Sequence, residues 1–285
     1  MELPAEVNAL IRLALAEDVG EGDVTVKYFV PEAAFATAVV VAREPGVLSG
    51  VEVAEAVFRE VDQDLKVVAV KSEGDQLVKG DVVLKISGKA GSILTAERTA
   101  LNFLQRLSGI ATQTAACVSA AAGTGTTILD TRKTTPGWRW LEKAAVRAGG
   151  GRNHRAGLYD MVMVKDNHLP EAGGLQGLQR GILTVQGAHP GMKIELEADT
   201  VDQVREFLGL RGVHIVLLDN MTLDEMRECV ALARGTGVQL EASGGITLER
   251  LPEVASTGVD FISLGALTHS VRALDLALDF TANPL

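Results

Sequence analysis

Apolar residues in the second half of the chain occur in six short runs, and each run ends at a polar residue or a glycine. Successive ends lie 22 to 35 residues apart. This spacing leaves room for a loop and one helix between strands, so it predicts repeated βα units and a parallel sheet. The runs are TILD (127–130), MVMVK (161–165), KIELE (193–197), IVLLD (215–219), QLEAS (239–243) and FISLG (261–265).

An open doubly wound sheet and a barrel both satisfy this pattern. The barrel is favoured because every run places a residue capable of chemistry at its C-terminal end, and that end forms the active face of α/β barrels. Six units are too few for a barrel of eight strands. We therefore predict an incomplete, open α/β barrel of about six parallel strands, with its open side covered by an N-terminal α/β segment.

The first third of the chain mixes helical and strand-like patterns. Helical spacing of apolar residues predicts helices over 4–17, 51–61 and 95–122, the last broken at Ser108-Gly109. Short apolar runs predict strands within 36–42, 64–72 and 81–87.

The run EGDQLVKGDVVLKI (73–86) looks like the hairpin of a biotinyl or lipoyl carrier domain. Such carriers present a modifiable lysine within a short motif such as EAMKM. The text that follows here is SGKAGSIL, which lacks that motif. We interpret the run as an ordinary β-hairpin.

Composition and cysteine usage limit the class of protein. The chain is 47% hydrophobic and only 4% aromatic, which suits closely packed α/β layers. No apolar run approaches the roughly 20 residues needed to cross a bilayer, and the N-terminus carries acids where a signal peptide would be basic. Cys117 and Cys229 lie far apart without a CxxC motif, so we expect reduced core thiols in a soluble, cytoplasmic protein.

Positive charge is concentrated in residues 132–155, which hold seven lysines and arginines and one acid, in a chain of net charge −10. A cationic segment in an acidic protein indicates a site for a small, densely anionic ligand. The acidic remainder would repel nucleic acid. A solvated helix face is the other interpretation, but Pro136-Gly137 and the glycines at 149–151 do not suit a simple charged helix.

Two glycine-bearing loops follow the last two runs, SGGIT (243–247) and GALT (265–268). Each precedes a helix-like stretch, so we expect backbone N–H groups and a helix N-terminus to face one phosphate. A single SGG is weak evidence, and two such loops in successive units strengthen it.

Glu197 and Asp219 end successive strands and should lie side by side at the edge of the sheet. Carboxylates facing a phosphorylated ligand hold Mg²⁺ or a ribose; alternatively, each caps the following helix. Lys165 would place a cation on the barrel floor, where an anionic partner is expected. His154 is either an anion donor, a proton carrier or a structural residue. The histidines without mutual metal spacing are His168, His189, His214 and His269, and we assign them no metal.

Several motifs, taken in order, resemble the quinolinate phosphoribosyltransferase family (nicotinate-nucleotide pyrophosphorylase, carboxylating). They are DTRKTTPG (130–137), NHR (153–155), VKDNH (164–168), LLDN (217–220) and EASGGI (241–246), and the likeness extends upstream through ERTALNFLQRLSGIAT (97–112). It implies a type II phosphoribosyltransferase with an N-terminal α/β sandwich domain at 1–110, on which 270–285 pack back, and an open α/β barrel at 111–269.

The implied reaction transfers the phosphoribosyl group of 5-phosphoribosyl-1-pyrophosphate (PRPP) to quinolinate. Decarboxylation follows, giving nicotinate mononucleotide, pyrophosphate and CO₂ in NAD biosynthesis. The family works with Mg²⁺ and needs no organic cofactor. It acts as a homodimer with shared active sites, or as a larger assembly up to a hexamer of dimers.

The resemblance also implies roles for individual residues. Quinolinate would be held by Arg132, Arg155, His154 and Lys165, with Arg98 of the partner subunit. Thr131 and Lys133 would flank substrate and pyrophosphate, while Glu197 and Asp219 would meet the ribose hydroxyls and Mg²⁺, directly or through water. The 5′-phosphate would lie on Ser243, Gly244, Gly245 and Gly265. The residues expected to act in catalysis are Lys133, Lys165, Glu197 and Asp219.

Two other functions remain compatible with the sequence. One is a same-fold paralogue associated with molybdenum transport, which should lack part of the basic set that this chain retains. The other is a non-catalytic protein that binds a phosphorylated metabolite. Neither a nucleic-acid nor a membrane partner is expected.

Overall fold

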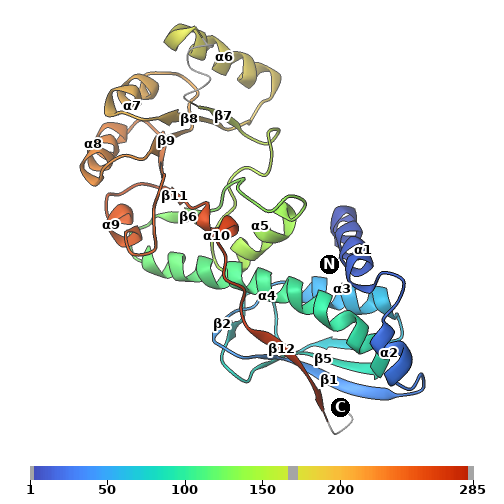
Figure 1. Cartoon of the computed structure of the whole chain (residues 1–285). Helices are drawn as coiled ribbons and strands as arrows, with labels where there is room; N and C mark the ends of the chain where they lie inside the picture. Colours follow the sequence, from blue (N-terminus) through green and yellow to red (C-terminus); the bar gives the residue numbers. More distant parts are fainter. Residues whose placement is uncertain (1–2, 166–172, 282–285) are drawn as a thin grey trace. The chain divides into compact units, whose positions relative to one another are not determined.

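The computed structural model describes residues 3–165 and 173–281, which form two compact units (Figure 1). Unit 1 comprises Met1–Ala115, Thr134–Gly150 and Leu267–Leu285, and unit 2 comprises Ala116–Lys133 and Gly151–Ala266. The chain therefore passes between the units several times. Residues 134–150, which lie within the range assigned to the barrel from the sequence, belong to unit 1.

Unit 1 is built on a four-stranded antiparallel sheet with the order β12-β1-β5-β3. Its central strand β1 arises from the β-branched run AVVV, of which Val40 is fully buried. The last strand of the chain, β12, pairs with β1 along its whole length. The four strands are β1 (Phe35–Ala42), β3 (Lys66–Ala69), β5 (Val82–Lys89) and β12 (Leu276–Thr281).

The hairpin predicted over 73–86 is wrong. Its first part, β4 (Gln76–Leu77), pairs with β2 (Gly46–Val47) in a separate two-stranded sheet. Its second part is β5, which pairs with β1 and β3 instead. Local alternation of apolar residues was read correctly as strand, but it carries no information about the pairing partner.

The longest helix of the chain is α4 (Ala90–Ala120), with 31 residues. Its buried residues recur every three to four positions, as in Ile93, Ala96 and Ala100, which gives a continuous apolar stripe. The break predicted at Ser108-Gly109 is absent. A Cβ at Gly109 would lie 2.2 Å from the backbone oxygen of Arg272, so this glycine allows a close approach of another segment.

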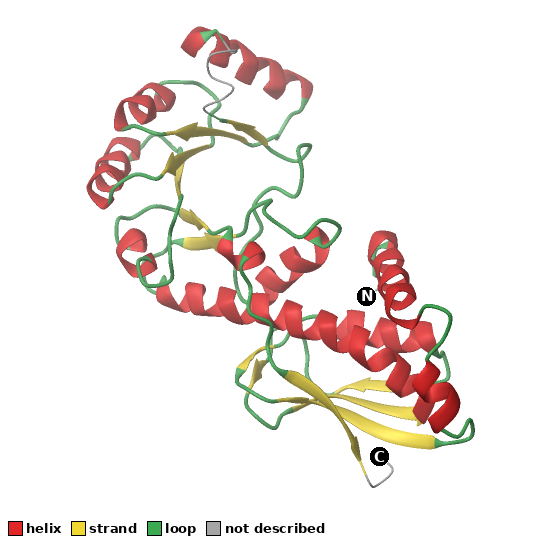
Figure 2. Cartoon of the chain, viewed as in Figure 1, coloured by secondary structure: helices red, strands yellow, loops and turns green. Residues whose placement is uncertain are grey.

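The remaining helices of unit 1 follow the sequence pattern closely. Helix α3 occupies the predicted range, and α1 buries Val7, Ile11 and Leu15 on one face. Figure 2 shows the helices of this unit together with its strands. The helices are α1 (Ala5–Val19), α2 (Val24–Phe29), α3 (Val51–Val61) and α5 (Arg139–Ala148), with α10 (Ala266–His269) beginning at the boundary.

A buried ion pair attaches the segment 134–150 to α4. Glu142 is fully buried, and its carboxylate accepts hydrogen bonds from the guanidinium of Arg106 at 2.8 and 3.1 Å. The same carboxylate accepts the backbone N–H and the hydroxyl of Thr135 at 3.1 and 2.9 Å. Arg106 also donates to the backbone oxygen of Thr268. One charged pair therefore holds three segments of unit 1 together.

Unit 2 contains a six-stranded parallel sheet with the order β6-β11-β10-β9-β8-β7. Strand β6, the first of these strands along the chain, pairs with β11, the last. The described residues show no pairing between the two edge strands β6 and β7, so the sheet curves without closing (Figure 1). This confirms the predicted open α/β barrel. The strands are β6 (Thr127–Leu129), β7 (Val162–Val164), β8 (Ile194–Ala198), β9 (Ile215–Asp219), β10 (Gln239–Ser243) and β11 (Phe261–Ser263).

Helices connect these strands and cover the outer face of the sheet. In β8 and β9 the residues Leu196, Ala198 and Leu218, which share one face of the sheet, are inaccessible to solvent, as expected for a face that helices cover. No described helix is long and apolar enough to span a membrane. The connecting helices are α6 (Gly174–Ala188), α7 (Val201–Leu208), α8 (Leu223–Ala233) and α9 (Leu251–Ala255).

We expect Glu142→Gln to destabilise unit 1, because the change leaves the Arg106 guanidinium without its counter-charge. Breaking a fully buried pair costs about 3–5 kcal/mol, but Arg106 is 32% exposed, so we expect a smaller loss, about 2–3 kcal/mol. Urea unfolding measures the loss. The control is Asp224→Asn, which removes an exposed pair with Arg227 and should leave the unfolding midpoint unchanged. Equal effects of the two changes would contradict the role given to Glu142.

Candidate functional site

The carboxyl ends of the six parallel strands bring the predicted site residues to one edge of unit 2. Lys165 follows β7, Asp219 ends β9 and Ser243 ends β10. The register places Asp219 directly beside Ser243 and Val164 beside Leu196, so Lys165 and Glu197 are neighbours. The edge of the sheet was therefore predicted correctly from the positions of the run ends.

Asp130 organises the start of this edge. It is fully buried at the end of β6, and its two carboxylate oxygens accept the Asn153 side-chain amide at 2.6 Å and the His154 backbone N–H at 2.8 Å. Arg152 extends this arrangement through a parallel bridge to Leu129. The DTR and NHR motifs, far apart in the sequence, are thus held side by side.

A buried group of three titratable residues lies deeper in unit 2. His154 Nε2 lies 3.0 Å from a carboxylate oxygen of Glu195 and 3.3 Å from one of Glu241. Glu195 is 0% exposed, and Glu241 is 1% exposed. On the other side of the ring, Nδ1 accepts the backbone N–H of Arg155 at 2.8 Å. Nδ1 therefore offers its lone pair, and the ring proton belongs on Nε2 between the carboxylates.

The electrostatics of the group agree with this placement of the proton. Burial alone would lower the pKa of His154, but the hydrogen bonds and charges of Glu195 and Glu241 outweigh burial and raise it. Burial raises the pKa of Glu195 to about 7, against the lowering effect of His154. Together the three side chains form a compact buried unit in which the carboxylates are the partners of one imidazole.

Glu195 and Glu241 are site residues that the sequence analysis missed. Each lies two positions before a predicted site residue, Glu197 on β8 and Ser243 on β10. Since side chains of a strand alternate between its faces, residues two apart share a face. Two acids at these positions in otherwise apolar strands were the available signal, because acids are rarely buried without a function or a partner.

Arg132 and Arg155 approach each other closely enough to interact. Burial lowers the pKa of Arg155, the positive charge of Arg132 lowers it further, and the carboxylates of Glu195 and Asp160 oppose both effects. The arginines come from the two motifs that Asp130 holds together. Two guanidinium groups that repel one another at one edge form a site prepared for an anion with paired oxygens.

Lys165 lies at the rim of the site rather than on its floor, where the sequence analysis placed it. Its side chain is 43% exposed, and Nζ lies 2.6 Å from Glu197 Oε2. The expected anionic partner is thus Glu197. The floor is formed by His154, Glu195 and Glu241 instead, because Lys165 follows the last residue of β7 and is not part of the strand.

Glu197 and Asp219 lie side by side, as predicted. Burial raises the pKa of Asp219, and the negative charge of Glu197 raises it further. Neither carboxylate caps a helix, because the N-caps of α7 and α8 are Thr200 and Thr222, each within a complete capping box. The structure thereby excludes the capping interpretation and leaves both acids available to a ligand.

The loop after β10 has the backbone conformation that its glycines suggest. Gly244 and Gly245 have φ angles of 96° and 56°, which favour glycine. Gly244 also lies against Asn220, whose Oδ1 would be 2.2 Å from a Cβ at position 244. The expected helix N-terminus is not at this loop, because α9 begins only at Leu251. Gly265, by contrast, directly precedes α10.

The other predicted residues are divided between the two units. Arg98 is exposed on α4, in unit 1. The cationic segment 132–155 is divided, since Arg139, Lys143 and Arg147 belong to α5 of unit 1. Thr131 and Lys133 follow Asp130 in unit 2, where the Thr131 hydroxyl accepts the Lys133 N–H at 3.0 Å. His168 lies outside the described residues. Cys117 and Cys229 are buried free thiols, as expected.

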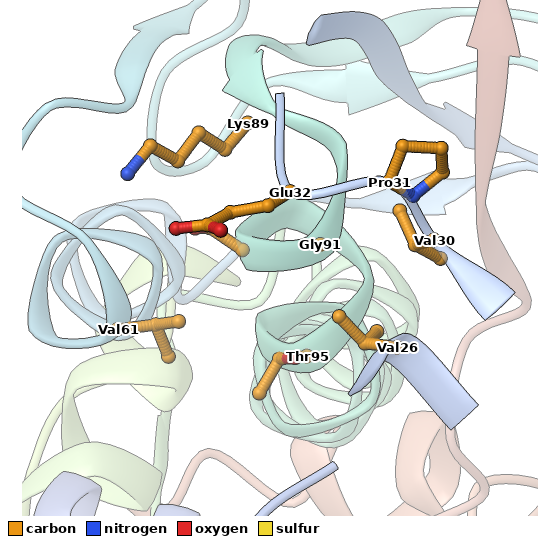
Figure 3. Close-up of a pocket in the computed structure, with 9 residues that line it drawn as sticks. Val26, Val30, Pro31, Glu32, Val61, Lys89, Gly91 and Thr95 are labelled. Carbon is orange, nitrogen blue, oxygen red and sulfur yellow. The ribbon is translucent and has the colours of Figure 1, made fainter. Parts of the chain in front are cut away.

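A pocket of about 260 Å³ lies in unit 1 (Figure 3). Its lining includes Val26, Val61 and Thr95, together with one cation, Lys89, and one acid, Glu32. A balanced pair of charges in an apolar surround does not match a densely anionic ligand. The edge of unit 2, where several cations converge, is the better candidate for the functional site.

The fold and the site define an open α/β-barrel protein with a cationic anion-binding edge, and comparisons with known proteins identify its family. The C-terminal and N-terminal domain models of quinolinate phosphoribosyl transferase match residues 110–279 and 23–108. The chain belongs to the quinolinate phosphoribosyl transferase family.

Named relatives agree over nearly the whole length. A probable nicotinate-nucleotide pyrophosphorylase (carboxylating) of Bacillus subtilis (strain 168) is 42% identical over 276 residues, which are 97% of this chain and 94% of the relative. Quinolinate phosphoribosyltransferase (decarboxylating) 1 of Nicotiana glauca is 43% identical over 289 residues, covering 96% and 82%. The structure of the nicotinate-nucleotide pyrophosphorylase from Francisella tularensis matches with a TM-score of 0.91 and 36% identity over 98% of both chains.

We expect Gly244→Ala to destabilise the protein more than Gly80→Ala does. Both glycines have nearly the same positive φ, 96° and 97°, so both changes carry a backbone cost of about 1–2 kcal/mol. Only position 244 adds a collision, with Asn220, because nothing lies within 4 Å of a Cβ at Gly80. We expect a further loss of about 1–3 kcal/mol for that overpacking. Urea unfolding compares the two, and equal losses would show that the contact with Asn220 is not restrictive.

Proposed function

We infer that this protein transfers the phosphoribosyl group of PRPP to quinolinate and releases one carboxylate of quinolinate as CO₂. The products are nicotinate mononucleotide and pyrophosphate, and the reaction belongs to NAD biosynthesis. The observation that carries this inference is the edge of unit 2, where Arg132, Arg155 and Lys165 converge beside Glu197 and Asp219 in a chain that matches both family domains. Cations suited to binding a dicarboxylate thus lie next to acids suited to binding the hydroxyls of a ribose.

At the acceptor end of the site, Arg132 and Arg155 would bind the two carboxylates of quinolinate, with Lys165 and His154 beside them. Guanidinium groups suit this task because each can donate two parallel hydrogen bonds to one carboxylate. The repulsion between Arg132 and Arg155 in the absence of ligand supports the assignment, since a dianion would relieve it.

At the donor end, Glu197 and Asp219 would meet the ribose hydroxyls of PRPP, and Ser243, Gly244, Gly245 and Gly265 would bind its 5′-phosphate. Thr131 and Lys133 would flank the pyrophosphate. The positive φ angles of Gly244 and Gly245 support close approach of a phosphate to the backbone.

We also propose Mg²⁺ as the metal that accompanies PRPP. Glu197 and Asp219 fit such an ion, directly or through water, because they are adjacent carboxylates: burial raises the pKa of Asp219, and the negative charge of Glu197 raises it further. When bound, Mg²⁺ would neutralise charge on the pyrophosphate. The chemistry requires no organic cofactor.

The protein's own groups contribute mainly electrostatics. As pyrophosphate leaves, positive charge develops at ribose C1, where Glu197 and Asp219 would stabilise it, while Lys133 and Lys165 would offset the charge of the leaving group. The pyridine nitrogen of quinolinate bonds to C1 and becomes quaternary. Loss of CO₂ then leaves an electron pair at C2 that the pyridinium ring stabilises, and a proton replaces the carboxylate.

We propose that the active form is a homodimer, alone or within a larger assembly such as a hexamer of dimers. Arg98 would complete the neighbour's site. Its exposure on α4 supports this, as do exposed apolar side chains in the N-terminal segment. These are Val24, Tyr28, Phe29 and Phe35, which are 66–81% exposed in the single chain. Two reduced thiols support a cytoplasmic location.

The assay that tests the function mixes pure protein with PRPP, Mg²⁺ and either quinolinate or nicotinate. We expect CO₂ and nicotinate mononucleotide in equal amounts from quinolinate. Nicotinate lacks the 2-carboxylate and would leave cations unpaired, so its kcat/KM should be lower by about 10⁴ or more. Comparable values for the two acids would indicate a plain nicotinate phosphoribosyltransferase. Absence of any product would favour the molybdenum-associated paralogue or a non-catalytic binding protein.

The proposed carboxylate contacts predict that lysine cannot replace Arg132 or Arg155. Arg→Lys at either position should lower kcat/KM for quinolinate nearly as much as Arg→Ala, because an ammonium does not reproduce the bidentate donor. Losing one partner of a buried charged pair costs about 2–5 kcal/mol. The control is Arg205→Lys on the surface of α7, which should be silent. Near-normal kinetics of both site lysine variants would rule out the paired contacts.

Sharing of Arg98 predicts complementation between inactive variants. Arg98→Ala and Lys165→Ala homodimers should each be inactive, whereas heterodimers formed by co-refolding should regain part of the activity, since some contain one intact site. Activity is measured on heterodimers purified with two different tags. Failure of verified heterodimers to recover activity would exclude a site completed by Arg98 of the partner subunit.

A further inference from the structure

The buried carboxylates Glu195 and Glu241 have no role in the reaction as described so far. We propose that they are positioning residues for quinolinate binding: they anchor His154, and His154 in turn holds the backbone of Arg155, which carries one of the guanidinium groups proposed to bind quinolinate. The inference rests on the proposed function and extends it to two residues beneath the site.

Burial makes these carboxylates rigid but costly. Glu195 lies within β8 and Glu241 in the middle of β10, and neither is more than 1% exposed. A buried carboxylate is tolerated only when it is well paired. Among the described residues, His154 Nε2 faces both, at 3.0 and 3.3 Å, in an ion pair rather than in well-aligned hydrogen bonds. Apolar residues would have been less costly at these two places, so the acids are explained by what they hold.

His154 transmits this anchoring to Arg155. The ring Nδ1 of His154 accepts the backbone N–H of Arg155 at 2.8 Å, and the backbone N–H of His154 donates to the Asp130 carboxylate at 2.8 Å. The imidazole is therefore held at Nε2 by Glu195 of β8 and Glu241 of β10. The backbone N–H of His154 is held by Asp130, and that of Arg155 is held by the imidazole ring. With this support, the Arg155 side chain starts from a fixed backbone position, as a binding group must if it is to be preorganised.

Charge gives Glu195 a second effect. Arg132 and Arg155 repel one another before any ligand arrives, and the charge of Glu195 acts on Arg155 in the opposite direction. Glu195 thus offsets part of the repulsion that would otherwise push the guanidinium groups apart. Anchoring and charge compensation both favour the arrangement that a dianion requires.

A divalent ion held by the same three side chains is the competing explanation. One ligand atom from each of His154, Glu195 and Glu241 lies within 4.8 Å of the others. The ion-pair explanation is preferred because the carboxylate oxygens already lie within hydrogen-bonding reach of Nε2, and the Arg155 N–H on Nδ1 directs the ring proton to that side. Elemental analysis of the pure protein and activity after chelation with fresh Mg²⁺ added back distinguish the two.

The first experiment compares Glu195→Ala and Glu241→Ala with Glu195→Gln and Glu241→Gln in steady-state kinetics. Supporting residues of this kind typically change function ten- to a hundredfold. We expect the alanine variants to raise KM for quinolinate by roughly that factor, with kcat changed less than about threefold and KM for PRPP unchanged. The glutamine variants keep an oxygen that can accept from Nε2 and should recover most of the loss.

Matched controls come from the same strands. Leu196→Ala and Leu240→Ala remove fully or almost fully buried side chains next to the two acids but on the opposite face of each strand. They should lower stability without changing KM for quinolinate. If an alanine variant of an acid does not fold, its glutamine variant and the leucine control still give the comparison.

The second experiment is a double-mutant cycle with His154→Ala. If Glu195 acts mainly through His154, then Glu195→Ala should add only a small further rise in KM once His154 is alanine, the part that comes from its charge acting directly on Arg155. Additive effects, an equal rise in KM for PRPP, unchanged KM for quinolinate in both alanine variants, or a bound metal whose removal abolishes activity would each overturn the inference. An inactive wild-type protein would instead count against the proposed function.

Discussion

Cations that bind a dicarboxylate must be held close together before the ligand arrives, although they repel one another. In unit 2 this constraint would apply to Arg132 and Arg155, which we propose bind quinolinate; burial lowers the pKa of Arg155, and the positive charge of Arg132 lowers it further. The opposing charges come from Glu195 and Asp160 and lie within the same unit. A salt bridge at the surface would contribute little to such an arrangement. Of the two counter-charges, Glu195 lies in the buried floor, where its charge is screened less than at the surface, whereas Asp160 is exposed.

The period of a β-strand allows one strand to provide both the floor and the rim of the site. In β8, Glu195 faces His154 while Glu197, two residues later, pairs with Lys165. In β10, Glu241 and Ser243 repeat the arrangement. The residues between them face the helices and form the core. Packing and chemistry are thus separated by face along the same strand, and a change on one face need not disturb the other.

The sequence was most informative where the pattern reflects local geometry. The six run ends predicted the edge of the sheet because a parallel βα repeat brings carboxyl ends together. The sequence could not show which distant segment is a partner. The alternating run at 73–86 was read as one hairpin, although β4 and β5 belong to different sheets. The sequence predicts a helix break at Gly109, but the helix needs a glycine there because the backbone of Arg272, far along the chain, approaches it closely.

The same limit explains why the floor of the site was missed. Glu195 and Glu241 lie in different strands and are related through a histidine in a third segment, so the sequence does not connect them with each other, although each lies two positions before a predicted site residue. Their burial became visible only with the fold. The segment 134–150 is a comparable case, because the pair between Arg106 and Glu142 assigns it to unit 1 despite its position between barrel strands in the sequence.

Helix capping determines which acids at the edge are available for chemistry. A strand end followed by a helix leaves several backbone N–H groups in need of acceptors, and an acid at the strand end is a natural candidate. Here Thr200 with Gln203 and Thr222 with Glu225 supply those acceptors. Glu197 and Asp219 are therefore not consumed by the helices. Burial and the negative charge of Glu197 raise the pKa of Asp219, and the side-chain amide of Asn220, which donates to its carboxylate at 2.8 Å, offsets this in part. The two strand ends therefore carry negative charge that neither following helix N-terminus neutralises.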